Sequence, residues 1–370
     1  MQIKRLKLSD FRNYENEEIE FSEGQNIIFG ENAQGKTNLL ESIFYLSCLK
    51  PFRGSRDADA IMKEREYAEI KGTFIAYERD VEVKCILSRS GRQIFVNGVR
   101  ERSPRNHIGL IKTVVFSPDD LQLIKEGPAR RRRYMNIALS QMLPAYIEAL
   151  AEHNKLIESK RKILKDEKSR HIYYDYVDVL NEKLAKCAAY ITYERGEFIK
   201  AINVTASETM KKISGGKDVI SVKYNCDSAI SNHTDKNNAR FILEHLKRRK
   251  EAEFASGFCL VGTHRDDFTV SVNGNSARDF GSQGQIRSCV LSLKVAEHAV
   301  IEKDSGEAPI LLLDDVLSEL DPSRRSFLLN DVNRGQTIIT GCDPSMFSEL
   351  SKGRIFTVED GRIIDKRNNE

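Results

Sequence analysis

One glycine-rich stretch constrains this chain more than any other feature of its sequence. The stretch fits the pattern G-x-x-x-x-G-K-[ST], in which backbone N–H groups close around phosphate oxygens, and it consists of Gly30, Glu31, Asn32, Ala33, Gln34, Gly35, Lys36 and Thr37. An apolar run at residues 25–29 precedes it, and a helix is expected at residues 37–46. A helix that begins at such a loop presents its positive end to an anion. The stretch therefore predicts a strand, a phosphate-binding loop and a helix.

Two side chains of this loop have predictable chemistry. Lys36 places a positive charge at the β- and γ-phosphates of a nucleotide, and the hydroxyl of Thr37 is a ligand for Mg²⁺. A second anchor lies far along the chain, where the apolar run Ile310–Leu313 ends in Asp314 and Asp315. Ligands of parallel sheets lie at the carboxyl ends of the strands. We expect Asp314 to hold Mg²⁺ opposite Thr37, and Asp315 to orient or deprotonate an attacking water.

The composition is that of a globular protein, with 370 residues, 40% hydrophobic residues and a formal net charge of +3. No apolar run is long enough to cross a bilayer, and the N-terminus has no apolar core typical of a signal peptide. The seven cysteines are scattered without a C-x-x-C pair, which favours reduced thiols over a disulfide framework or a zinc site. We expect a cytoplasmic protein.

The secondary-structure pattern indicated by the sequence changes twice along the chain. Residues 1–118 and 258–370 show mixed strand and helix patterns, whereas residues 119–257 are dominated by long polar helices at 144–165 and 173–212. The middle segment holds 26 Lys and Arg against 20 Asp and Glu. The pattern predicts an α/β nucleotide domain that is interrupted by a basic, mainly helical arm or antiparallel helix pair.

A third motif, Phe280–Arg287, is a turn of small residues that opens a helix. Its Ser282-Gln283-Gly284-Gln285 resembles the signature motif of ABC-type ATPases, and Ser318–Asp321 resembles their D-loop. More particular runs make the chain similar to the RecF family, bacterial recombination mediators related to SMC proteins. These runs are Leu8–Tyr14, Phe116–Leu121, Glu126–Arg133, Gly262–Asp267, Gly281–Arg287 and Leu313–Asp321.

The resemblance implies an ABC-type ATPase head in which two chains enclose ATP. Ser282 and Gly284 would then contact the γ-phosphate of ATP that is held by a second subunit, Gln285 would belong to the same nucleotide-binding motif, and Arg12 would touch the nucleotide. Most ABC ATPases have Glu where this chain has Asp315, so the resemblance implies slow hydrolysis. The switch histidine of those enzymes has no counterpart, because Gly341-Cys342-Asp343 follows the expected strand at residues 337–340.

The same resemblance implies ATP-dependent homodimers that bind single-stranded and gapped DNA, associate with the nucleoid and help to load a recombinase with RecR and RecO as partners. Two alternatives are a transporter's nucleotide-binding subunit and a metabolic P-loop kinase. The long insert argues against the first, and the Ser282–Gln285 motif argues against the second.

Three basic runs could neutralise DNA phosphates without reading bases, although each is also compatible with an ordinary solvated or structural surface. They are Arg130–Arg133, Lys160–Lys162 and Lys247–Lys250. For His264 we expect a structural or interfacial role, with Arg265, Asp266 and Asp267 in a charge network.

Overall fold

The computed structural model of the chain describes residues 1–52, 56–166, 173–226, 238–331, 335–342 and 353–369. The chain divides into two compact units. Unit 1 comprises residues 1–121, 212–215 and 290–370, and unit 2 comprises residues 122–211 and 216–289. None of the helices in the described part of the chain is both long and apolar enough to cross a membrane.

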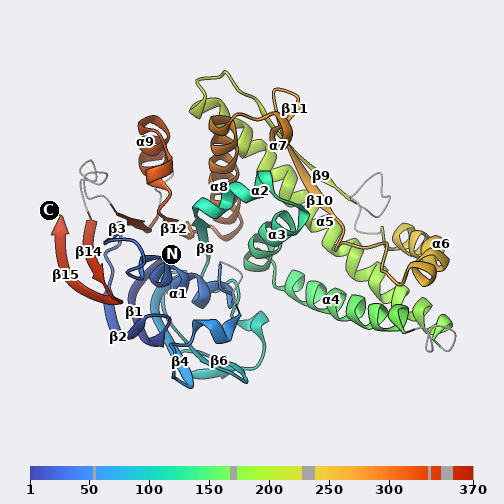
Figure 1. Cartoon of the computed structure of the whole chain (residues 1–370), viewed down its shortest axis with the longest axis horizontal. Coiled ribbons are helices and arrows are strands. Elements are labelled where there is room, and N and C mark those ends of the chain that lie inside the picture. The colour runs from blue at the N-terminus through green and yellow to red at the C-terminus, as the bar shows by residue number, and fades with distance from the viewer. Residues whose placement is uncertain (53–55, 167–172, 227–237, 332–334, 343–352, 370) are drawn as a thin grey trace. The chain divides into compact units, whose positions relative to one another are not determined.

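A mixed six-stranded sheet forms one layer of unit 1, with the strand order β15-β14-β3-β13-β12-β8 (Figure 1). Its central strands are buried apolar runs joined in parallel, as is typical of sheets covered on both faces. Only the last strand, β15, pairs antiparallel, in a hairpin with β14. The strands are β3 (Gln25–Phe29), β8 (Thr113–Phe116), β12 (Ile310–Asp314), β13 (Thr337–Gly341), β14 (Gly353–Glu359) and β15 (Arg362–Asn369).

A second, antiparallel six-stranded sheet in unit 1 has the order β2-β1-β4-β5-β6-β7. Its longer strands alternate buried and exposed residues, so one face packs on the core and the other meets solvent. The strands are β1 (Gln2–Phe11), β2 (Tyr14–Glu20), β4 (Tyr67–Ala76), β5 (Arg79–Ser88), β6 (Gly91–Val96) and β7 (Val99–Glu101). The turn between β1 and β2 is short, because the two strands already pair at Phe11 and Tyr14.

Helix α1 (Lys36–Cys48) begins directly after the glycine-rich loop and is buried around most of its circumference. It contacts β4 of the antiparallel sheet and β12 and β13 of the mixed sheet. A helix that is apolar on nearly all sides belongs in the interior of a domain. The phosphate-binding loop is therefore attached to the most enclosed helix of unit 1. Helices α8 (Gln283–Ser305) and α9 (Pro322–Asp331) precede and follow β12.

Unit 2 is mainly helical, as the sequence predicts for this part of the chain. It also contains a small antiparallel sheet with the order β11-β10-β9, whose strands are β9 (Ile220–Asn225), β10 (Asp267–Val272) and β11 (Asn275–Ser276). Its helices are α2 (Gln122–Lys125), α3 (Pro128–Met142), α4 (Pro144–Lys165), α5 (Tyr174–Ile213), α6 (Ala239–Ser256) and α7 (Ala277–Phe280).

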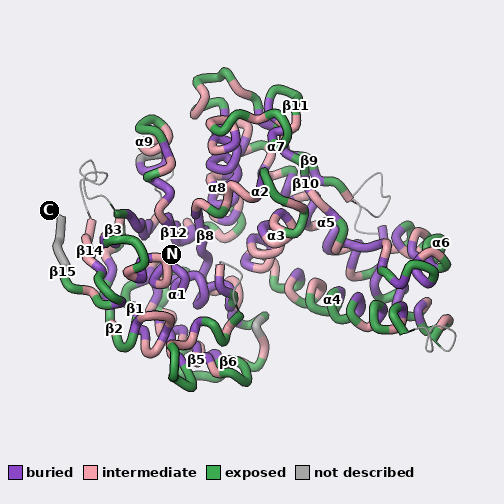
Figure 2. The backbone as a smooth tube through the Cα atoms, in the orientation of Figure 1, coloured by how far each residue is buried: buried purple, intermediate pink, exposed green. Residues whose placement is uncertain are grey.

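The helix pair predicted from periodicity is formed by α4 and the first half of α5. Helix α5 is continuous over 40 residues, about 60 Å at the rise of an α-helix. Leu156 and Leu164 of α4, Val177 and Leu184 of α5, and Leu246 of α6 lie in one apolar cluster. Figure 2 shows the buried stripes of these helices turned toward one another and their outer faces exposed. The three helices thus share one elongated core.

Candidate nucleotide site

The glycine-rich loop has the close contacts that its glycines permit. A Cβ on Gly30 would lie 2.3 Å from the carbonyl oxygen of Val358, and one on Gly35 would lie 2.6 Å from the side-chain nitrogen of Asn13. Gly35 also has a φ of 113° at the residue before α1, where larger residues are strained. These two positions are therefore closed to larger residues by backbone packing and by conformation.

Lys36 is held inside the loop that it belongs to. Its ammonium donates to the carbonyl oxygens of Gly30 and Glu31, both at 2.7 Å, and lies 3.3 Å from the Sγ atom of Cys342. The Cys342 thiol in turn donates to Asn32 at 3.0 Å. The lysine is buried, so its charge is fixed in place by the loop's own oxygens. Cys342 directly follows strand β13.

The two anchors found in the sequence meet at the carboxyl end of β12. The hydroxyl of Thr37 donates to Asp314 Oδ1 at 2.7 Å, and the hydroxyl of Thr340 donates to the same oxygen at 3.1 Å. Asp314 is 1% exposed, and the parallel pairing of β12 with β13 sets Asp314 opposite Thr340. A buried carboxylate beside a hydroxyl is a pair of hard oxygen ligands, which is the chemistry that Mg²⁺ requires.

Asp315 follows with a φ of 54°, a left-handed conformation that turns the chain sharply after the strand. Its backbone N–H donates to the Thr340 hydroxyl at 3.0 Å, and its carbonyl accepts from Ser318 at 2.8 Å. Asp315, Asp314 and the loop line one cavity of about 270 Å³, to which Pro118 also contributes. The structure thus brings Gly35, Lys36, Thr37, Asp314 and Asp315 together at one cavity.

Two residues beneath the loop escaped sequence reasoning. Asn13 donates to the carbonyl of Gln34 at 3.0 Å and accepts from Asn38 at 2.8 Å, while the buried Tyr14 hydroxyl donates to the carbonyl of Gly35 at 3.1 Å. Burial raises the pKa of Tyr14 above its ordinary value, which keeps this hydroxyl a donor. Both residues lie in the Leu8–Tyr14 run, whose only assigned member was Arg12.

The Arg12 side chain makes contacts within the fold in this structure. Its guanidinium pairs with the buried Glu41 of α1 at 2.9 Å and donates to the carbonyl of Asp59 at 2.7 Å. Arg12 is not among the residues that line the cavity described above. Its predicted contact with a nucleotide stays a prediction.

The signature-like motif belongs to unit 2 and caps helix α8. Ser282 and Gln285 bond reciprocally: the Gln285 N–H donates to the Ser282 hydroxyl at 3.2 Å, and the Ser282 N–H donates to Gln285 Oε1 at 3.1 Å. This is the geometry of a capping box. The Gln285 amide also donates to Asp218 at 2.9 Å. The Gln285 side chain therefore has a structural task, while Ser282 is exposed.

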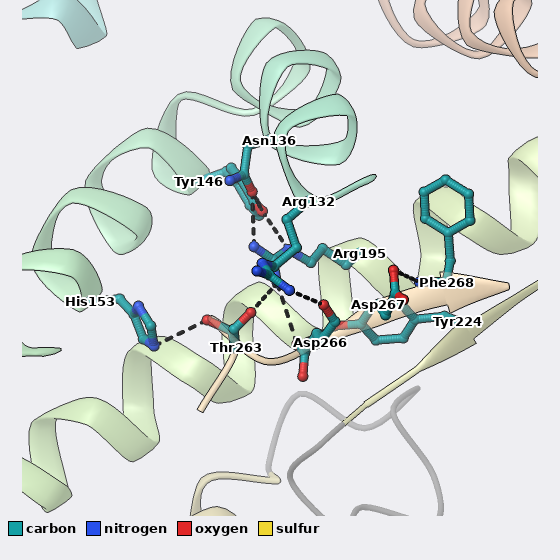
Figure 3. Close-up of polar contacts among 10 residues, drawn as sticks. All are labelled: Arg132, Asn136, Tyr146, His153, Arg195, Tyr224, Thr263, Asp266, Asp267 and Phe268. Carbon is teal, nitrogen blue, oxygen red and sulfur yellow. Dashed lines mark hydrogen bonds and ion pairs between the residues drawn. The ribbon is translucent and has the colours of Figure 1, made fainter. Parts of the chain in front are cut away.

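The charge network expected around His264–Asp267 is present, and its centre is Arg195 of α5 (Figure 3). The Arg195 guanidinium donates to the Tyr146 hydroxyl at 3.0 Å, the Asn136 side chain at 2.9 Å and the Thr263 carbonyl at 2.7 Å. It also lies 3.4 Å from the carboxylate of Asp266, and both side chains are at most 2% exposed. The network joins α3, α4 and α5 to the loop before β10.

Two histidines of this region, the buried His153 and the half-buried His264, have lowered pKa values. Burial lowers the pKa of His153 to about 3, with a further contribution from His264. Burial likewise lowers the pKa of His264 to about 4. The Nε2 atom of His153 lies 3.1 Å from the Thr263 hydroxyl, and the Nε2 atom of His264 lies 3.3 Å from the Cys259 carbonyl. These contacts support the structural role expected for His264.

Some cations of the three basic runs form ion pairs within unit 2. Arg131 forms two bonds with Asp267, at 2.6 and 2.8 Å. Lys160 is fully buried, with Glu253 at 2.5 Å. Lys250 pairs with Asp178 at 2.8 Å.

Each run therefore contains at least one cation that stabilises unit 2 and is withdrawn from solvent. Lys247, Arg248 and Arg249 remain exposed.

Comparison with known proteins defines the class first. A family model described as "RecF/RecN/SMC N terminal domain" matches residues 2–363. The Smc head domain of Pyrococcus furiosus superposes with a TM-score of 0.55 at 18% identity, covering 99% of this chain and 96% of that chain. The fold predicted from the motifs, that of an ABC-type ATPase head, is thereby confirmed.

Closer relatives define the family. "DNA replication and repair protein RecF" of Listeria monocytogenes is 35% identical over 98% of this chain and 99% of its own length. The protein of the same name from Halalkalibacterium halodurans is 37% identical over 99% of this chain and 100% of its own length. A solved structure of "the recombination mediator protein RecF-ATP in RecFOR pathway" superposes with a TM-score of 0.92 at 32% identity, covering 99% of this chain and 97% of that chain. The chain belongs to the RecF family of DNA replication and repair proteins.

Proposed function

We propose that this chain is an ATP-dependent DNA-binding protein of recombinational and replication-gap repair, in which ATP joins two copies of the chain around DNA. One observation carries the proposal: the phosphate-binding loop and the acid-tipped strand β12 share one cavity, with Thr37 2.7 Å from Asp314. Family membership supports an ATPase of the ABC type, and a RecF structure described with ATP supports the choice of nucleotide.

The residues of unit 1 have separate tasks in this proposal. The loop N–H groups and Lys36 hold the phosphates, which requires the ammonium to exchange some of its present contacts with the Gly30 and Glu31 carbonyls for phosphate oxygens. Thr37 and Asp314 would hold Mg²⁺, which supplies positive charge at the β- and γ-phosphates. Asp315 would accept the proton of the attacking water, and its short side chain would make hydrolysis slow.

The second half of the site comes from a second copy of the chain. The exposed Ser282 and its neighbour Gly284, at the beginning of α8, would contact the γ-phosphate held by the partner subunit. Gln285 would act by fixing Ser282 through their reciprocal hydrogen bonds. Residues 119–257 are proposed as a helical arm between the two halves of the ATPase domain, residues 1–118 and 258–370.

The proposed role in the cell follows from the family. A solved RecF structure is assigned to the RecFOR pathway, which supports RecR and RecO as partners, single-stranded and gapped DNA as ligands, and the loading of a recombinase as the outcome. Slow hydrolysis would then release the dimer from DNA.

Sedimentation of the full chain with and without ATP and Mg²⁺, alone and with a gapped duplex, tests the proposal. We expect ATP to convert the wild-type monomer into a dimer that retains DNA. Lys36→Arg should weaken both effects, because a planar fork replaces the compact ammonium, whereas the exposed control Lys63→Arg should not.

Ser282→Arg separates the two halves of the site. It should leave ATP binding by the monomer intact and block dimerisation, whereas Ser90→Arg, on an exposed turn, should dimerise normally. Normal ATP-driven dimerisation of both Lys36→Arg and Ser282→Arg would contradict the proposal.

A further inference from the structure

The stretch 89–105 of unit 1 carries an excess of positive charge that the nucleotide site does not use. It contains five arginines and a single acidic residue within 17 positions. The stretch includes β6 and β7, which pair as a hairpin through the Asn97-Gly98 turn. Strand β7 lies at the end of the antiparallel sheet, so it has a neighbouring strand on one side only.

A hollow of about 530 Å³ is formed by this hairpin and the residues that follow it. Its lining includes the guanidinium-bearing side chains of Arg92, Arg100 and Arg102 together with the polar side chains of Gln93 and Ser103. Every one of these five side chains can donate a hydrogen bond. The hollow is about twice the volume of the cavity at the phosphate-binding loop, which is about 270 Å³.

One of the three arginines is fixed in place. An Arg92 nitrogen donates to the Tyr45 hydroxyl at 3.1 Å, to the carbonyl of Leu49, and to Asp57 at 3.0 Å. These bonds engage a single terminal nitrogen, so the other N–H groups of the planar guanidinium are not used by them. Arg92 therefore enters the hollow as a positioned donor.

The other two arginines are not neutralised by the fold. Arg100 and Arg102 are exposed, and their side chains form no hydrogen bond or ion pair within the residues that the structure describes. The one acid of the stretch, Glu101, also lines the hollow, so three cations there face a single carboxylate. Glu101 accepts a hydrogen bond from Asn106 at 2.9 Å and has no ion pair with either arginine. Like charges that share one hollow repel each other. The arrangement therefore gains from any anion that enters.

We propose that this hollow binds the phosphodiester backbone of DNA. Planar guanidinium groups match the oxygens of phosphate in a bidentate manner, and the amide and hydroxyl beside them are also typical donors to backbone phosphates. A DNA strand presents several phosphates in a row. It therefore matches three guanidinium groups spread over this volume better than one small anion does. Because no aromatic side chain lines the hollow, base stacking contributes nothing, and the contact is independent of sequence. The proposal rests on the proposed function in that DNA is the ligand, but it requires no nucleotide.

The test is fluorescence anisotropy of a labelled gapped duplex titrated with the full-length chain at several salt concentrations. Arg100→Ala/Arg102→Ala removes two cations whose side chains make no hydrogen bond or ion pair with the part of the chain that the structure describes. If each engages one phosphate, the slope of log affinity against log salt falls by about 1.8, and the affinity at 0.1 M salt falls by about 60-fold for equal binding at 1 M. The matched control is Arg79→Ala/Arg89→Ala, which removes the same charge from two exposed positions outside the hollow, one in β5 and one in the turn that follows it.

The outcomes are distinguishable from those of the proposed function. A loss of affinity and slope in the hollow variant, with the control unchanged and ATP-driven dimerisation intact in both, supports the DNA site. Equal affinities of the two variants overturn it while leaving the proposed function standing. Calorimetry with pyrophosphate tests whether the hollow binds a small phosphorylated ligand instead. The proposal would be overturned if the wild type bound pyrophosphate tightly and the hollow variant lost this binding without any change in its affinity for DNA. Failure of the wild type to bind DNA would overturn both.

Discussion

Replacement of Arg195 by Met should be among the most destabilising single changes in unit 2. The change removes the charge that faces the buried Asp266 and deprives Tyr146, Asn136 and the Thr263 carbonyl of their shared donor. Removal of one partner of a buried ion pair typically costs about 3–5 kcal/mol, because the remaining charge is left without compensation. We expect a loss near 4 kcal/mol, a large part of the roughly 5–15 kcal/mol that holds a typical domain together.

The source of this loss can be separated by a double-mutant cycle. Asp266→Asn removes the carboxylate charge but keeps an oxygen that can accept from the Tyr224 hydroxyl, which now donates to Asp266 at 2.5 Å. The double variant Arg195→Met/Asp266→Asn should therefore recover about 2 kcal/mol relative to the sum of the single changes.

Urea unfolding followed by circular dichroism at pH 7 measures the four stabilities. Arg240→Met is the matched control, since its ion pair with Glu244 lies on the exposed face of α6 and surface pairs of this kind contribute little. Two results would refute the reasoning: an Arg195→Met variant as stable as Arg240→Met, or strictly additive losses in the cycle.

Two further predictions concern the stability of the chain at low pH and its affinity for ATP. Since His153 and His264 keep pKa values of about 3 and about 4 in the folded chain, the unfolded chain binds protons below a pH of about 6.5 that the native chain does not. The free energy of unfolding should therefore fall as the pH falls, by about 2 kcal/mol per histidine between pH 7 and pH 5. Urea unfolding midpoints that do not change between pH 7 and pH 5 would contradict this. Gly361→Ala should weaken ATP binding at least tenfold in calorimetry, because its Cβ would lie 2.1 Å from the carbonyl of Asn13, whereas Gly24→Ala, which has open space around it, should bind normally.

The parts of the fold that sequence reasoning predicted are those that depend on local patterns. Residues 25–29, 310–314 and 337–341 form strands because they are continuous apolar runs, and residues 144–165 form a helix because their apolar positions recur every three or four residues. Asp314 meets Thr37 because parallel strands end at one edge of the sheet, a rule that needs no contact information.

The parts that were missed depend on partners far along the chain. Arg131 and Lys160 have the sequence context of solvated cations, yet Asp267 and Glu253, roughly a hundred positions away, withdraw them into unit 2. Asn13 supports the phosphate-binding loop across 21 positions. Burial of a polar residue is decided by whether such a partner arrives, and no local pattern encodes that arrival.

The cysteine beside the phosphate-binding loop gives this site a chemical handle. Among the described residues, Cys342 is the one exposed thiol, whereas burial raises the pKa values of Cys48, Cys85 and Cys289 to about 12 and makes them poor nucleophiles. Its sulfur lies 3.3 Å from the ammonium of Lys36, the group that, in the proposed function, would turn to phosphate when a nucleotide enters. In the proposed function, the rate at which a maleimide labels Cys342 would therefore report, optically and without an engineered cysteine, the fraction of nucleotide sites that are occupied.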